Sequence, residues 1–120
     1  MDSLPITVRT TLLGAANLIR QRGWAKFTMQ DYEGRLCVRG AIRRYLAETL
    51  PADTDPVIWE TVTERAEQWV NNYVVRHKGA FVDGTRFSPT AGVVLAPWND
   101  LVCQSQDEAA GVLEAAAQVL

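Results

Sequence analysis

The stretch from Gly34 to Leu46 constrains the fold most, because the spacing of its apolar residues changes within it. Up to Val38 the apolar residues alternate with others, as they do on a β-strand. Beyond Val38 they recur at the three- and four-residue spacing of one helix face: Ala41, Ile42, Tyr45 and Leu46. The stretch therefore predicts a strand that leads directly into a helix. Glycine early in that helix, at Gly40, costs about 0.5–1 kcal/mol relative to alanine, so we expect another backbone segment to approach closely there.

Amphipathic patterns predict four helices, over residues 5–21, 38–49, 56–77 and 108–119. Asp55 followed by Pro56 is typical of a helix start, because the carboxylate caps free N–H groups and proline presets φ. Gly23 is expected to end the first helix in a left-handed conformation. Ser105 and Glu108 have the spacing of a capping box before the last helix.

The third predicted helix has one broad apolar face and one polar face. The apolar face is expected in the core and carries Ile58, Trp59, Val62, Ala66, Trp69, Val70 and Tyr73. The polar face is expected in solvent and carries Glu60, Glu64, Arg65, Glu67 and Gln68.

Two segments predict short β-hairpins. Residues 25–38 alternate in polarity around a turn over Asp31 to Arg35, and Asp83-Gly84 is a two-residue hairpin signal. The expected fold class is therefore α+β and mostly helical, with about four helices and one or two short β-hairpins. We expect residues 1–120 to form a single compact domain, since no linker or repeat divides the chain.

The composition indicates a soluble globular protein, with 48% hydrophobic and 22% charged residues. No apolar run reaches the roughly 20 residues that span a bilayer, and the N-terminus lacks the pattern of a secretory signal. These features predict a cytoplasmic protein with no membrane partner. Cys37 and Cys103 are too few for a disulfide framework and are expected to be buried thiols.

Charge is unevenly distributed along the chain. Residues 1–45 hold eight Lys/Arg against three Asp/Glu, a net charge of +5, while residues 46–120 hold four against eleven, a net charge of −7. Much of the positive charge is in one arginine row, which is the predicted interaction surface: Arg35, Arg39, Arg43 and Arg44. The row can serve a partner, or it can pair with the acidic third helix.

Three short motifs carry a resemblance to a known family. They are Gly23-Trp24 after a helix, Gly34-x-x-Cys37-x-x-Gly40-Ala41, and Trp98-Asn99-Asp100 before an alanine-rich helix. With these motifs the chain, from about Leu12 to Ala117, resembles a family of small uncharacterised proteins from actinobacteria and their phages, a domain of unknown function. The resemblance implies a fold and a source, and no activity. The segment of residues 76–95 is longer than the pattern of that family requires.

A second resemblance is to the DNA-binding end of TetR-like repressors, carried by Leu12 to Trp24 and the Val38 to Leu46 stretch. It implies a DNA-binding regulator that uses the arginine-bearing helix 38–49. The interruption at Asp31 to Gly34 argues against it, because a helix-turn-helix requires a helix there.

A third hypothesis is a cysteine-dependent hydrolase that uses Cys37 with His77 and either Asn99 or Asp100. Cys37 lies in an apolar run suited to burial, and the only histidine is at a predicted helix end, so we expect no enzyme activity. One histidine and two distant cysteines also give no metal-ligand spacing, and no cofactor is expected.

The tripeptide Trp98-Asn99-Asp100 has a structural and a functional interpretation. In the structural one, Trp98 fills the core while Asn99 or Asp100 bonds nearby backbone, such as the turn from Cys37 to Gly40. In the functional one, it is a recognition loop. We expect a small cytoplasmic accessory or regulatory protein that binds another protein. A phage-encoded protein directed at a host factor is one such case, and nucleic acid is the alternative partner. The sequence does not predict the oligomeric state.

Overall fold

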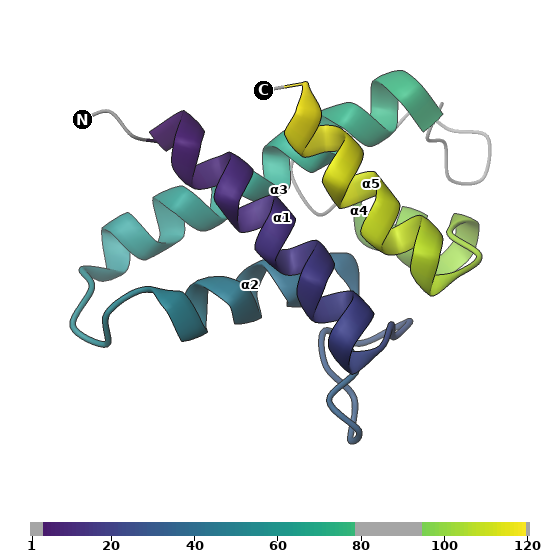
Figure 1. The fold of residues 1–120 in the computed structure, drawn as a ribbon, viewed down its shortest axis with the longest axis horizontal. Coiled ribbons are helices and arrows are strands. Elements are labelled where there is room, and N and C mark those ends of the chain that lie inside the picture. The colour runs from purple at the N-terminus through teal and green to yellow at the C-terminus, as the bar shows by residue number, and fades with distance from the viewer. Residues whose placement is uncertain (1–3, 79–94, 120) are drawn as a thin grey trace.

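The computed structural model describes residues 4–78 and 95–119, and these residues form an all-helical fold (Figure 1). The helices in chain order are α1 (Leu4–Arg22), α2 (Val38–Thr49), α3 (Pro56–Lys78), α4 (Leu95–Pro97), the π-helical turn η1 (Trp98–Val102) and α5 (Gln106–Gln118). Helices α1 and α5 lie side by side, and α2 and α3 pack against α1 and pass behind it in the view of Figure 1. None of the helices in the described part of the chain is long and apolar enough to cross a membrane.

The fold-class prediction of α+β was wrong, because the described residues contain no strand. Residues 25–37 form an irregular loop, and the predicted hairpin is reduced to two isolated bridges, Trp24 with Leu36 and Gln30 with Leu36. One physical reason is Phe27, whose φ of 65° breaks the extended backbone that a ladder needs. The second predicted hairpin, around Asp83-Gly84, lies outside the described residues.

The predicted helix ends at Gly23 and Asp55 are confirmed. Gly23 has a φ of 102° after the last residue of α1, and Asp55 accepts a hydrogen bond from the N–H of Val57 at 2.8 Å. Helix α5 begins at Gln106, two residues before the predicted start. Ser105 caps it by accepting from the N–H of Glu108, whose carboxylate in turn accepts from the N–H of Gln104.

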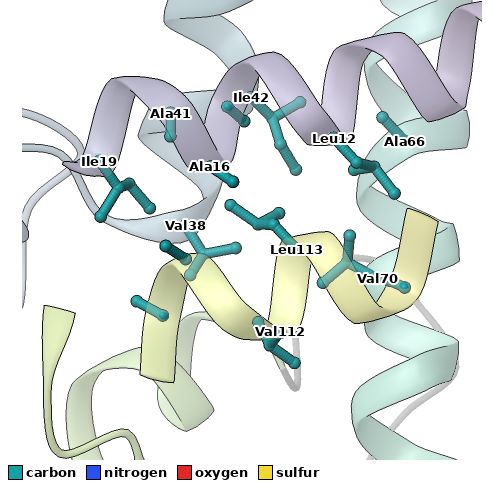
Figure 2. Packing of buried hydrophobic residues seen from close by; sticks show 14 of the residues in the cluster. Leu12, Ala16, Ile19, Val38, Ala41, Ile42, Ala66, Val70, Val112 and Leu113 are labelled. Atoms are coloured by element: carbon teal, nitrogen blue, oxygen red, sulfur yellow. The ribbon is translucent and has the colours of Figure 1, made fainter. Parts of the chain in front are cut away.

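One hydrophobic core joins the helices (Figure 2). The core residues labelled in Figure 2 come from four helices: Leu12, Ala16 and Ile19 from α1, Val38, Ala41 and Ile42 from α2, Ala66 and Val70 from α3, and Val112 and Leu113 from α5. Leu95 at the start of α4 is also fully buried.

Two predictions for α3 were wrong. Ile58 was expected in the core and is 54% exposed, because the first turn of α3 lies at the end of the molecule beside the connection from α2 (Figure 1). Glu67 was expected in solvent and is 2% exposed, because arginines of α2 cover it.

Candidate interaction site

The side chain of Asn99 joins three parts of the chain that are far apart in sequence. It is 1% exposed and lies on η1. Its Oδ1 accepts hydrogen bonds from Trp24 Nε1 at 2.8 Å and from the backbone N–H of Val38 at 3.1 Å. Its Nδ2 donates to the carbonyl of Ala25 at 3.1 Å and to Asp100 Oδ1 at 2.9 Å. Asn99 thereby fastens the end of α1, the start of the loop 25–37 and the start of α2 to one another.

Asp100 extends this network to the loop itself. Its Oδ1 accepts from the backbone N–H of Phe27 at 2.8 Å, besides the bond from Asn99. Phe27 has a φ of 65° and a residue exposure of 72%. A left-handed φ is rare for a bulky side chain, so the contact with Asp100 holds Phe27 in a conformation that it would not adopt alone.

Apolar side chains are exposed on both segments of this network. On the loop, Phe27, Met29 and Tyr32 are exposed, and on η1 Leu101 is 62% and Val102 is 40% exposed. We call these five side chains the apolar patch. Of the five, Phe27 and Met29 line one hollow together with Asp100, and large exposed apolar side chains of this kind are candidates for an interaction site.

The turn from Cys37 to Gly40 connects the loop to α2. Cys37 is the N-cap of α2, and its Sγ accepts from the N–H of Gly40 at 3.2 Å. The close approach at Gly40 comes from the loop, because a Cβ there would collide with the carbonyl oxygen of Met29. That same oxygen accepts from the N–H of Cys37 at 3.2 Å. The loop therefore packs directly on the first turn of α2.

Two members of the arginine row are engaged with α3. Arg39 Nε lies 3.3 Å and Arg43 Nε 2.9 Å from Glu67 Oε2. The carboxylate is buried, while the two guanidinium side chains are 24% and 29% exposed. The two arginines balance the charge that Glu67 would otherwise bring into the protein interior.

The other two members of the row are more exposed. Arg35 pairs with Asp31 at 2.6 Å within the loop, and this contact lowers the pKa of Asp31 against the opposing effect of burial. Arg44 donates from Nε and Nη2 to Gln30 Oε1 and lies 4.0 Å from Glu48. The row is thus divided between the interior contact with Glu67 and the surface of the loop.

The residues of the hydrolase hypothesis are not arranged as a catalytic set. Cys37 lines a hollow with Asp100, whereas His77 lines a different hollow and stacks on Tyr73 with 4.4 Å between ring centroids. Burial raises the pKa of the Cys37 thiol, which disfavours the nucleophilic thiolate. Burial also raises the pKa of Cys103 to about 11. Within the described residues, no group of three or more His, Cys, Asp or Glu side chains could hold a metal ion.

The comparison with known protein families decides the family. The model described as Family of unknown function (DUF6197) matches residues 3–119. The chain belongs to this family. No curated protein and no solved structure matches it.

In this DUF6197 member, three residues of the site escape sequence reasoning. Phe27 was assigned to a strand, Glu67 to a solvent face, and Met29 to the same strand as Phe27. No signal in the sequence predicts the positive φ of Phe27. Trp98 is 1% exposed and its Nε1 has no hydrogen-bond partner among the described residues, so it fills the core while its neighbours Asn99 and Asp100 form the network.

Proposed function

We propose that this member of the family is a non-catalytic protein-interaction module, and that the apolar patch on the loop 25–37 and η1 is its binding surface. We further propose that it is a small cytoplasmic accessory or regulatory protein of an actinobacterium or an actinophage, and that its target is a host protein. The single observation that carries the proposal is the exposed, strained Phe27 held by Asp100.

Energetics favour an interaction role for Phe27. A left-handed conformation costs an L-residue about 1–2 kcal/mol. A phenylalanine that is 72% exposed gains little in return within the folded chain. A partner that covers the ring would bury much of an aromatic surface, and rigid, pre-positioned aromatic side chains are frequent anchors of protein interfaces.

The arginine-bearing helix gives less support to DNA binding. Two of its three arginines, Arg39 and Arg43, are hydrogen-bonded to the buried Glu67. A phosphate contact by either side chain would compete with that interaction and leave the buried carboxylate of Glu67 with less compensating positive charge. We therefore propose a protein partner and use DNA binding as a test outcome.

The proposal is tested by affinity capture from an actinobacterial lysate with quantitative mass spectrometry. The baits are the wild-type chain, Phe27→Ala and Leu13→Ala. Leu13 is a matched control, because it is an exposed apolar residue on α1 (45% exposed). A protein enriched by the wild-type chain and by Leu13→Ala, and lost with Phe27→Ala, supports the proposal. The same enrichment with all three baits would refute it, as would a salt-sensitive DNA mobility shift without any Phe27-dependent protein.

A further inference from the structure

A groove runs from the loop 25–37 to the start of α3. It consists of two adjoining hollows, and the half-buried Trp59 and its neighbour Ala47 line both of them. The first hollow has a volume of about 280 Å³ and reaches Met29 and Gly40, and the second has about 340 Å³ and reaches Pro51 and Glu60. We call these two hollows the Trp59 groove.

Met29 connects the groove to the apolar patch. It lines the first hollow of the groove and also a hollow of about 190 Å³ that Phe27 and Asp100 line. A ligand that covers Phe27 can therefore continue over Met29 to Trp59 without leaving the surface. Phe27, Met29 and the two hollows of the groove therefore adjoin one another through shared lining residues.

The groove lies beside a surplus of positive charge. Arg22 and Arg44 approach the same carboxylate, Glu48, at 2.8 and 4.0 Å, and Arg39 and Arg43 share Glu67. Within these contacts of the described residues, four guanidinium groups meet two carboxylates, a surplus of two positive charges, and Glu64 lines a neighbouring hollow with Arg39 and Arg43. Arg43 and Arg44 both line the first hollow, while Glu60 lines the second.

The ring of Trp59 is already used by a cation. The guanidinium carbon of Arg43 lies 5.8 Å from the ring centroid, within the range of a cation–π contact. This contact positions the charge of Arg43 over an apolar surface. The combination of an aromatic wall with arginines at its edge is complementary to a segment that carries apolar and acidic side chains together.

We propose that the Trp59 groove binds an acidic amphipathic segment of the partner protein, with an apolar side chain between Met29 and Trp59 and a carboxylate facing the more exposed Arg44. This inference rests on the proposed function and names the chemistry of the partner. The apolar lining of Met29 and Trp59 favours a protein segment over nucleic acid, and Arg44 at its edge favours an acidic segment. A second copy of this chain and nucleic acid are outcomes of the test.

The probe is a pair of displayed libraries of 16-residue peptides. In both libraries, the positions at helical spacing are randomised among apolar residues. The other positions are Asp, Glu or Ser in the acidic library and Lys, Arg or Ser in the basic one. The full chain is the bait, and the best peptide is resynthesised for calorimetry and for nitrogen–proton spectra, which report the indole N–H of each tryptophan.

We expect binders from the acidic library alone, with the indole signal of Trp59 shifted on binding. Arg44→Glu should weaken the peptide at least tenfold, and Trp59→Ala should abolish binding while circular dichroism remains helical. Arg76→Glu is the matched control, because Arg76 lies 17 residues further along α3, about 25 Å away, and should leave affinity unchanged.

Three results would overturn the inference: no enrichment from the acidic library, equal enrichment from the basic one, or a peptide affinity that Arg44→Glu and Trp59→Ala leave unchanged. Self-association of the chain, or binding of a DNA duplex, that Trp59→Ala removes would assign the groove to another occupant. The capture experiment with Phe27→Ala is independent of these peptides. A failure of the acidic segment is therefore distinguishable from a failure of the proposed function.

Discussion

At the scale of single residues, Asn99 determines how the loop is held. Its amide uses both hydrogens and accepts two hydrogen bonds, while almost no surface is exposed. Removing the amide leaves the indole of Trp24, the N–H of Val38 and the carbonyl of Ala25 without this partner. Leaving such buried groups unpaired has a larger effect than the net contribution of the bonds themselves.

We predict that Asn99→Ala lowers the free energy of unfolding by about 2–4 kcal/mol, because several buried polar groups lose their partner. Urea denaturation of the two proteins measures this difference. Asn72→Ala, at an exposed site on α3, should change stability by less than about 0.5 kcal/mol. A loss below about 1 kcal/mol for Asn99→Ala would show that the network is not important for the loop.

A substitution at Phe27 should raise stability, in contrast to the substitution at Asn99. We predict that Phe27→Gly raises the free energy of unfolding by about 1 kcal/mol, because glycine adopts a positive φ without the penalty of a Cβ. Thr28→Gly, at the exposed neighbour, should lower it, since Thr28 has no positive φ to relieve and loses its bond to the carbonyl of Gln30. Thermal and urea unfolding of both variants supply the comparison. A Phe27→Gly protein less stable than the wild type would mean that Phe27 is not strained.

At the scale of elements, the packing of the loop on α2 depends on Gly40. We predict that Gly40→Ala lowers stability by about 1–3 kcal/mol, because the new methyl group collides with the backbone of Met29 and displaces the loop. Gly111→Ala is the matched control in α5. Nothing lies within 4 Å of its added Cβ, so it should raise stability by about 0.5–1 kcal/mol. Similar effects of the two substitutions, measured by thermal unfolding, would contradict this packing.

The elements also show what the sequence can predict. Helices α1, α2 and α3 follow from apolar periodicity with the caps at Gly23 and Asp55, since these signals are local. The loop 25–37 does not, because alternating polarity at Lys26, Phe27 and Thr28 is typical of a strand. In the structure all three side chains are exposed, so the alternation does not correspond to one buried and one exposed face. Contacts with η1, more than 60 residues away in the chain, decide the conformation.

At the scale of the whole molecule, Glu67 shows the limit of sequence reasoning most clearly. A glutamate on a polar helix face is normally solvated. Here Arg39 and Arg43 reach across from α2 and close over it, an arrangement that arises only when α2 packs against α3. Arg39 and Arg43 were predicted as interaction residues, but their partner Glu67 was not, because these two pairings span 28 and 24 residues.

We predict that Glu67→Ala lowers the free energy of unfolding by about 2–4 kcal/mol, because it leaves a cavity and two arginines that repel each other. Glu64→Ala, at an exposed position one turn earlier, should have an effect within about 0.5 kcal/mol. Chemical denaturation of both variants tests the difference. Equal stability of the two variants would show that the buried ion pairs do not connect α2 to α3.

The central claim is that the network of Asn99 and Asp100 presents Phe27 to a protein partner. The most direct test is calorimetric titration of the captured protein, purified, with the wild-type chain, Phe27→Gly and Leu13→Ala. The account predicts that Phe27→Gly binds at least tenfold more weakly although it is the more stable protein, and that Leu13→Ala binds as the wild type does. An unchanged affinity for Phe27→Gly would contradict the account.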